Sequence, residues 1–99
     1  MRVLWTPRAL EDLKSIARHI AGDDPAAARR FAHRLKERAE SVATFPRRGR
    51  IVPEFGRADI RELIEGNYRI VYRVLEDEIH LLTIFEAHKL LQVTCPEQP

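Results

Sequence analysis

The stretch from Ile60 to Leu75 reads IRELIEGNYRIVYRVL and decides the fold. On each side of Gly66-Asn67 the chain is rich in β-branched and aromatic residues and has a period of two, as in strands with one buried face. A Gly-first pair between two such runs is typical of a II′ hairpin turn. The stretch therefore predicts two antiparallel strands, Ile60 to Glu65 and Tyr68 to Leu75, joined by a two-residue loop.

The residues that follow extend this hairpin into a meander. Ile79 to His88 is a third β-rich run, and Glu76-Asp77 is short enough to be a second two-residue turn. With two such turns, the face predicted to pack on helices carries Leu63, Ile70, Tyr72, Val74, Ile79, Leu81 and Phe85. The opposite face carries Arg69, Val71, Arg73, His80, Leu82, Ile84, Glu86 and His88.

The first half of the chain has a period of 3.6 and predicts two helices. After a short strand from Arg2 to Trp5, Thr6-Pro7 supplies the cap and first residue of a helix that ends at Gly22. Asp24-Pro25 repeats this start signal, and the second apolar stripe runs until Pro46. We therefore expect an α+β fold in which a short N-terminal strand and an antiparallel two-helix hairpin pack on a three-stranded antiparallel meander.

The length of 99 residues allows one domain, residues 1–99, in which we expect 92–99 to be a frayed tail. No apolar run is long enough to span a membrane, and the N-terminus lacks an apolar leader, so we expect a cytoplasmic protein. Cys95 is the single cysteine, and nothing around it predicts a disulfide, metal site, cofactor or nucleophile. The net charge of +2 is too small to indicate nucleic acid by itself.

Residues 46–59 have no period and form a cationic loop that carries Arg47, Arg48, Arg50 and Arg57 against Glu54 and, at its end, Asp59. Of the 17 basic residues in the chain, only three are lysines. Arginine binds carboxylates and phosphates bidentately, although codon usage in a GC-rich genome would give the same excess. Loops of this length are usually functional or disordered. We predict that this one captures an acidic partner electrostatically.

The second face of the predicted sheet has an apolar strip formed by Val71, Leu82 and Ile84 and framed by Arg69, Arg73, His80 and His88. A bare apolar patch on a small protein usually takes a partner. Alternatively, the loop from Pro46 or the C-terminal tail folds over the strip, and the sequence leaves both possibilities open. A plain nucleic-acid-binding module is disfavoured because no aromatic residues cluster on this cationic face, as base stacking requires.

The order of the elements and several strings resemble the ParE/RelE family of bacterial toxins, which type II toxin-antitoxin modules encode beside an antitoxin. The resemblance runs from Trp5 to Leu91 and is carried by residues 5–13, 49–54, 61–63, 67–74 and 85–91. The string YRIVYR at residues 68–73, followed by a strand that ends in histidine, is fairly specific. This resemblance implies a toxin without a cofactor that a cognate antitoxin neutralises.

Two activities occur on this fold in the family. ParE-like members bind DNA gyrase and trap it on cleaved DNA, whereas RelE- and YoeB-like members cut mRNA on the ribosome. Glu54, His88 and Arg69 match by position the residues of YoeB-like enzymes that would act as base, acid and cation. The RNA-cutting members, however, usually carry further arginine or a terminal tyrosine where this chain has Ala87, Lys89 and Val93. The resemblance thus favours gyrase inhibition, with ribosome-dependent mRNA cleavage as the alternative.

The candidate residues also have purely structural interpretations. Arg69 and Arg73 can pair with Glu62 or Glu86 across the sheet, Glu54 can neutralise its loop, and His88 can be an ordinary surface histidine. In the predicted register Arg69 lies opposite Ile84, four residues or about 13 Å from His88 at ~3.4 Å per residue, so only a bulge or bend would bring them together. The residues expected to contact the antitoxin or the target are Arg47, Arg48, Arg50, Arg61, Arg69, Val71, Arg73, Leu82, Ile84, His88 and Lys89.

Overall fold

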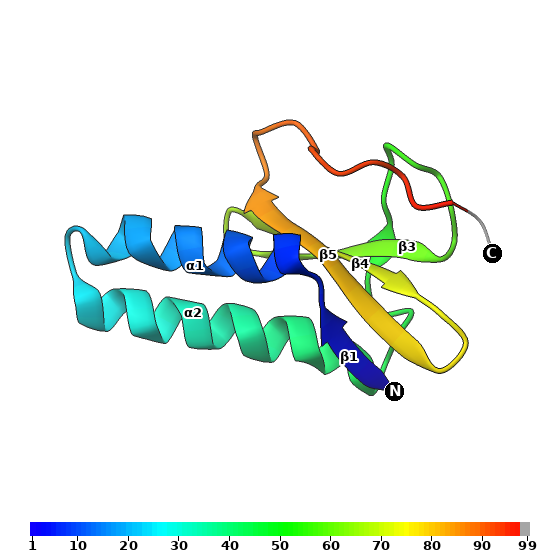
Figure 1. Cartoon of the computed structure of the whole chain (residues 1–99), viewed down its shortest axis with the longest axis horizontal. Helices are drawn as coiled ribbons and strands as arrows, with labels where there is room; N and C mark the ends of the chain where they lie inside the picture. Colours follow the sequence, from blue (N-terminus) through cyan, green and yellow to red (C-terminus); the bar gives the residue numbers. More distant parts are fainter. Residues whose placement is uncertain (98–99) are drawn as a thin grey trace.

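The computed structural model describes residues 1–97 and contains a five-stranded sheet in the order β1-β5-β4-β3-β2. Its elements are β1 (Arg2–Trp5), α1 (Pro7–Ala21), α2 (Pro25–Glu40), a 3-10 turn η1 (Ser41–Ala43), β2 (Arg50–Ile51), β3 (Ile60–Glu65), β4 (Tyr68–Val74) and β5 (Glu78–Glu86). The two helices form an antiparallel hairpin beside one face of the sheet and extend beyond it (Figure 1). The predicted α+β fold is confirmed.

The predicted meander forms the middle of this sheet. β3 and β4 pair antiparallel with Glu65 opposite Tyr68, and Gly66 has a φ of 57°, as the first residue of a II′ turn requires. β4 and β5 form the second hairpin. β1 adds to β5 in parallel and β2 adds to β3 antiparallel, so the sheet is mixed and has two strands more than the predicted meander.

The helices begin where the sequence predicts. The Thr6 side chain accepts a hydrogen bond of 3.2 Å from the Ala9 N–H, and a carboxylate oxygen of Asp24 accepts two of 3.1 Å from the second helix. α2 ends at Glu40, earlier than the predicted boundary at Pro46, because η1 tightens the chain before the proline. No helix within residues 1–97 is long and apolar enough to cross a membrane.

A β-bulge in β5 corrects the predicted register. Val71 pairs with Thr83 and Tyr72 pairs with Leu81, so Leu82 is an extra residue without a partner. The extra residue reverses the alternation beyond it. Ile84 was predicted on the outer face but lies in the main core opposite Ile70, only 2% exposed, and Phe85 takes the outer face instead.

Asp12 of α1 holds this bulge. A single carboxylate oxygen of Asp12 accepts two hydrogen bonds. One comes from the Ile84 N–H at 3.0 Å, and the other comes from the Thr83 hydroxyl group. These contacts join the first helix to the last strand across 71 and 72 residues of chain. The bulge therefore depends on a side chain that is remote in the sequence.

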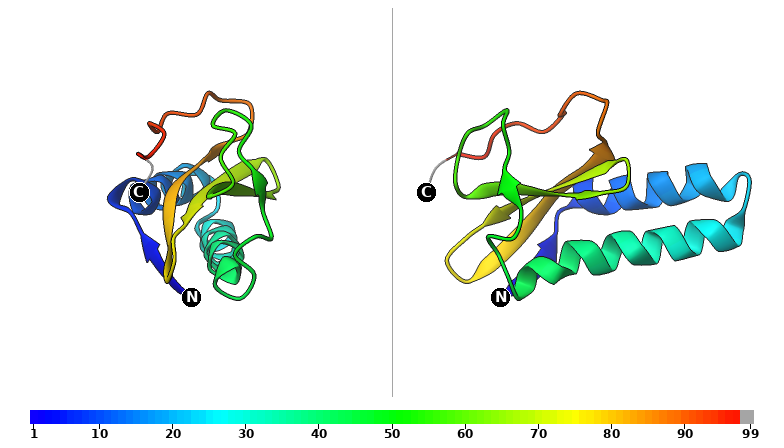
Figure 2. Two further views of the ribbon diagram at one scale, coloured as in Figure 1. Left: turned by 90° about the vertical axis from the view of Figure 1, so that its right-hand side faces the viewer. Right: turned by 180° about the vertical axis from the view of Figure 1, so that it is seen from behind.

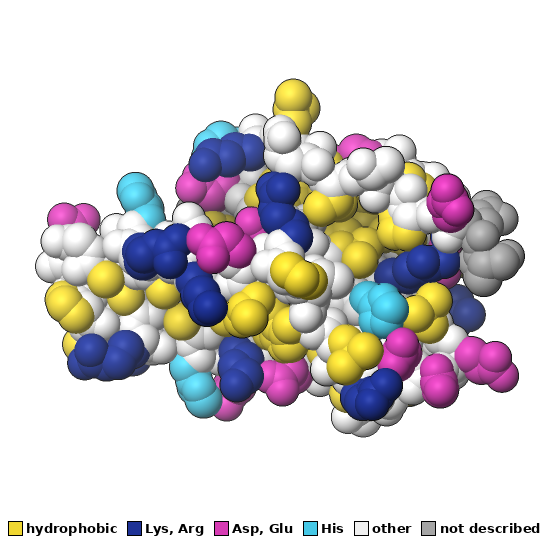
Figure 3. Space-filling view, in the orientation of Figure 1, with side chains coloured by type: hydrophobic (Ala, Val, Ile, Leu, Met, Phe, Trp, Pro, Cys, Tyr) yellow, Lys and Arg dark blue, Asp and Glu magenta, His cyan; other side chains and the backbone are white. Residues whose placement is uncertain are grey.

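The outer face of the sheet is covered by the loop after β2 and by the C-terminal tail, which cross it on the side away from the helices (Figure 2). Val71 is fully buried there in a second apolar cluster with Val52 and Ile60, and Leu91 and Cys95 of the tail pack on it. Of the two possibilities that the sequence left open for this residue, burial under the loop and the tail is therefore the one observed. Hydrophobic side chains still show between the tail and β1 in the space-filling view (Figure 3).

Two arginines fasten the tail to the sheet. Arg57 donates to the Pro96 carbonyl, and Arg73 donates to the Glu97 carbonyl at 2.8 Å. The carbonyl groups of Pro96 and Glu97 therefore have partners on the sheet side, while the frayed tail expected over residues 92–99 stays a prediction. Residues 98 and 99, the remainder of the predicted tail, lie outside the described residues.

The buried Tyr72 ties the start of the cationic loop to the core. Its hydroxyl group donates to the Pro46 carbonyl at 2.8 Å and accepts from the Gly49 N–H at 2.9 Å. The Gly49 Cα atom consequently packs against the backbone of β3. A Cβ atom at this position would overlap the Glu62 carbonyl and come within 2.7 Å of the Tyr72 hydroxyl oxygen.

We expect Gly49→Ala to lower the free energy of unfolding by about 1–3 kcal/mol, because the added methyl group meets backbone that cannot yield easily. Urea unfolding followed by circular dichroism measures this. Gly22→Ala is the matched control, since its Cβ would approach no atom closer than 3.5 Å and its φ is −55°. Equal stabilities of the two variants would contradict the close approach at Gly49.

Candidate functional site

An ion cluster with a buried centre contains Glu54 and Arg69, two of the three candidate catalytic residues. The Arg69 guanidinium group donates two hydrogen bonds of 2.7 Å to the Glu54 carboxylate and one of 2.6 Å to Glu62. The second oxygen of Glu62 accepts a hydrogen bond of 2.6 Å from Arg50. Arg69 is 8% exposed and Glu62 is 1% exposed. We call these four residues the Arg69 cluster.

Strand pairing explains the cluster. Ile64 lies opposite Arg69 across β3 and β4, which places Glu62, two residues away on the same face, within reach of the guanidinium group. Arg50 pairs with Glu62 across β2 and β3. Glu54 arrives from the turn after β2. The bulge in β5 adds Phe85, whose ring lies 5.0 Å from the guanidinium carbon of Arg69.

The charges of the cluster stabilise one another. Hydrogen bonds from Arg69 lower the pKa of Glu54 to about 2. The same bonds, followed by those to Glu62, raise the pKa of Arg69. Glu54 is therefore a carboxylate at neutral pH, and a group with such a low pKa is a weak acceptor for a hydroxyl proton. The pairing of Arg69 with Glu62, one of the structural interpretations, is confirmed.

His88 does not join the cluster. It lies in the turn after β5, where its Nε2 atom is 3.4 Å from a Glu86 carboxylate oxygen, and Lys89 lies 3.6 Å from the other oxygen of Glu86. The bulge places Arg69 opposite Phe85, one residue closer to His88 than in the predicted register. Even so, the histidine pairs with Glu86 while Glu54 pairs with Arg69. The three candidate catalytic residues thus belong to two separate groups of ion pairs.

The predicted binding arginines fall into two classes. Arg50 and Arg73 make ion pairs with Glu62 and Asp59, and Arg61 donates to two backbone carbonyls, Gly49 and Ala58, at 3.0 Å each. These side chains therefore contribute to the packing of the loop. Arg47 and Arg48 are exposed, and neither makes an ion pair within residues 1–97.

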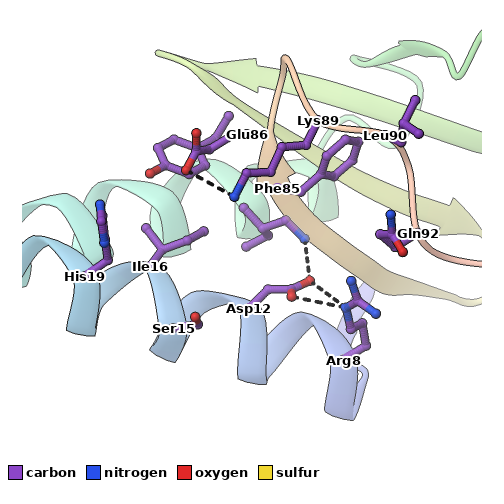
Figure 4. Close-up of a pocket in the computed structure, with 12 residues that line it drawn as sticks. Arg8, Asp12, Ser15, Ile16, His19, Phe85, Glu86, Lys89, Leu90 and Gln92 are labelled. Carbon is purple, nitrogen blue, oxygen red and sulfur yellow. Dashed lines mark hydrogen bonds and ion pairs between the residues drawn. The ribbon is translucent and has the colours of Figure 1, made fainter.

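A cleft of about 340 Å³ lies between α1 and the end of β5 (Figure 4). The helix lines it with Arg8, Asp12 and His19, and the chain after β5 lines it with Lys89 and Leu90. The floor is apolar and is formed by Ile16, Tyr68, Ile84 and Phe85. Leu90 is 82% exposed, more than any other large hydrophobic side chain of the described residues. The cleft combines apolar surface with an ion pair at each rim, Arg8 with Asp12 and Lys89 with Glu86.

Asp12 and Tyr72 are the structurally decisive polar residues that sequence reasoning did not single out. Asp12 lies on a helix among other charged residues, and nothing in its spacing marks it as the partner of a bulge. Tyr72 could have been found, because it is a hydroxyl-bearing residue in the middle of the strand face predicted to pack on the helices, and a buried hydroxyl group needs a hydrogen-bond partner.

Comparison with known proteins identifies the class. The fold matches a structure described as the chromosomal ParDE toxin-antitoxin system from P. aeruginosa, with a TM-score of 0.76 and 24% identity over 89% of this chain and 97% of that one. "Toxin RelE2" of Caulobacter vibrioides is 41% identical over 90 residues, which cover 90% of this chain and 98% of that protein. Residues 3–90 match the family described as "ParE toxin of type II toxin-antitoxin system, parDE".

Two helices on a mixed sheet, with an arginine-rich loop, therefore define a small toxin of the ParE/RelE class. The chain belongs to the ParE toxin family of type II toxin-antitoxin systems. The resemblance of the strings from Trp5 to Leu91 is confirmed.

The lowered pKa of Glu54 predicts a pH dependence of stability. Its ionised form is favoured in the folded state, so the contribution is complete above about pH 4.5 and is lost as the pH falls towards about 2. We expect Glu54→Gln to flatten the decline of the unfolding free energy between these values. Asp59, whose pKa is lowered by hydrogen bonds from Arg57, retains part of the slope in the variant.

Urea unfolding at about pH 6 and about pH 3 tests this expectation. Glu40→Gln is the matched control, since Glu40 is an exposed acid that makes no ion pair within residues 1–97. Equal flattening by both substitutions would show that Glu54 has no special role in acid unfolding.

Proposed function

We propose that this chain is a toxin that inhibits DNA gyrase by binding it, and that a cognate antitoxin neutralises the chain by covering part of its surface. Membership of the ParE toxin family supports the proposal, since the family is defined by type II toxin-antitoxin systems. A gyrase inhibitor needs a surface of suitable shape and charge. It needs no proton transfer.

The Arg69 cluster is the observation that carries the choice of a binding mechanism. RNA cleavage requires a base for the 2′-hydroxyl group, an acid for the leaving oxygen and a free cation for the charged phosphorane. Glu54 is ionised with a pKa of about 2, and all three donor groups of Arg69 are bound by carboxylates. His88 pairs with Glu86. Within the described residues these groups act as structural ion pairs.

The second candidate function is ribosome-dependent cleavage of mRNA. The name of the relative "Toxin RelE2" favours it, as does the presence of Glu54, Arg69 and His88 in this sequence. This function would require the ribosome or its RNA to break the ion pairs of Arg69 and Glu54.

We place the antitoxin at the cleft between α1 and the end of β5. The exposed Leu90 offers an apolar anchor, and Arg8 and Lys89, which pair with Asp12 and Glu86, can turn their remaining donors towards an acidic segment. Ile84, one of the predicted contacts, forms part of the floor. Val71 is buried under the tail, so a contact there would first require the tail to leave the sheet.

The two functions differ in what they require of Glu54 and His88. Removing a general base or acid typically lowers a rate by about 10²–10⁴. We expect Glu54→Gln and His88→Gln to leave growth arrest and inhibition of gyrase supercoiling nearly intact, because neither removes a large contact surface. Purified gyrase and translating ribosomes with mRNA are the two assays.

Cleavage of mRNA at the ribosomal A site, abolished together with toxicity by both Gln substitutions, would establish the second function and refute the first. Arg69→Ala is unsuitable for this test. It would leave the Glu62 carboxylate buried with fewer partners, which typically costs about 3–5 kcal/mol of stability for a broken buried pair.

The antitoxin site has its own test. We expect Leu90→Asp and Lys89→Glu each to weaken antitoxin binding by at least about tenfold, equivalent to ~1.4 kcal/mol, with an unchanged melting temperature because both side chains are exposed. Ile64→Asp is the control, since Ile64 is an exposed apolar residue that does not line the cleft. Calorimetric titration with the cognate antitoxin measures the affinities, and unchanged binding by the cleft variants would exclude this site.

A further inference from the structure

A rigid turn at residues 45–48 presents an exposed aromatic side chain. The Arg48 N–H donates to the Phe45 carbonyl at 3.0 Å, which closes the turn around Pro46. The hydroxyl group of the buried Tyr72 holds it from inside through the Pro46 carbonyl. Phe45 is nevertheless 62% exposed, so the core fixes the backbone of the turn while the aromatic ring stays in solvent.

Apolar residues surround this ring. Met1, Val74 and Leu75 line a shallow hollow together with Phe45 and the turn. Met1 is itself exposed, and its amino group donates to the Ala43 carbonyl at 2.9 Å, which keeps the N-terminus beside the turn. We call this region, with Arg47 and Arg48, the Phe45 surface.

The Phe45 surface carries free positive charge. Arg47 and Arg48 lie beside the hollow and make no ion pair within residues 1–97, whereas Glu76 is the single acid among the described residues that line it. Elsewhere in the fold arginines are commonly paired, as in the Arg69 cluster and at Asp59. The hollow therefore combines an apolar floor with an excess of positive charge at its rim.

The Phe45 surface and the proposed antitoxin cleft lie at opposite ends of β5. The turn between β4 and β5 and the N-terminus lie at one end, and the chain that leaves β5 towards the tail lies at the other (Figures 1 and 2). No residue lines both the hollow and the cleft. Two different partners can thus contact the two ends.

We infer that the Phe45 surface is the docking site for the toxin's target, and that it takes an acidic segment of a protein that inserts a large apolar side chain beside Phe45. The inference rests on the proposed function, under which the target protein is gyrase. Aromatic residues and arginines contribute most at protein interfaces, and a rigid turn loses little freedom on binding. The unpaired cations select an acidic segment.

The test compares Phe45→Ser, the double variant Arg47→Ser/Arg48→Ser and a matched control. The control Arg29→Ser/Arg30→Ser removes the same charge from two exposed arginines of α2 that make no ion pair within residues 1–97. Association with purified gyrase is measured at two salt concentrations, together with supercoiling inhibition, growth arrest, antitoxin affinity and melting temperature.

We expect Phe45→Ser to weaken gyrase binding at least tenfold, equivalent to ~1.4 kcal/mol. The double variant should slow association and reduce its salt dependence. The control, antitoxin affinity and melting temperature should stay unchanged.

Three results would overturn the inference. An equal effect of the control would mean nonspecific charge attraction, and an effect of the arginines without one of Phe45 would mean a polyanion such as nucleic acid. An equal loss of antitoxin affinity would assign the surface to the antitoxin. If the wild-type chain arrests growth without inhibiting gyrase, the proposed function fails. Growth arrest alone then decides whether the Phe45 surface is a docking site. Loss of arrest in Phe45→Ser then supports a docking site for another target, whereas full arrest rejects the site.

Discussion

One extra residue in the last strand determines which side chains of that strand face the core and which face outward. Leu82 has no partner on β4, and Asp12 of the first helix holds the bulge by binding the Thr83 hydroxyl group and the Ile84 N–H. Since neighbouring side chains on a strand alternate between its faces, the extra residue moves Ile84 into the core and Phe85 to the outer face. Both the main core and the surroundings of Arg69 depend on this shift. A polar contact between distant parts of the chain thus fixes which apolar side chains of β5 enter the core.

Under the proposed function the outer face is structural rather than reactive, and the Arg69 cluster supports this view. Glu62 is almost fully buried, and a buried carboxylate needs a cation and several hydrogen bonds. Arg69 and Arg50 supply them, and the remaining donors of Arg69 hold Glu54. Groups that satisfy one another in this way are poorly suited to exchange protons with a substrate. The same groups stabilise the loop after β2, which in turn covers Val71.

Under our proposals, the two open surfaces divide the functions of the toxin between the ends of β5. The cleft at one end has an exposed leucine and offers a site for the antitoxin, while the rigid Phe45 turn at the other end offers one for the target. The tail lies between them, fastened by Arg57 and Arg73 through backbone carbonyls. Both surfaces join apolar area to cations, which are unpaired at the Phe45 turn and paired with carboxylates at the cleft, so the stronger attraction for an acidic segment lies at the turn.

The sequence by itself determined the elements, because caps, turns and periodicity are local. Thr6-Pro7, Asp24-Pro25 and Gly66-Asn67 were sufficient to place both helices and the central hairpin, and the strings from Trp5 to Leu91 were sufficient to indicate the family. It also made Glu54, Arg69 and His88 candidates. Only the tertiary structure decided that Arg69 binds Glu54 and Glu62 while His88 stays apart, and that loop and tail bury Val71. These outcomes depend on the bulge at Leu82 and on contacts between residues far apart in the chain, for which local residue spacing carries no information.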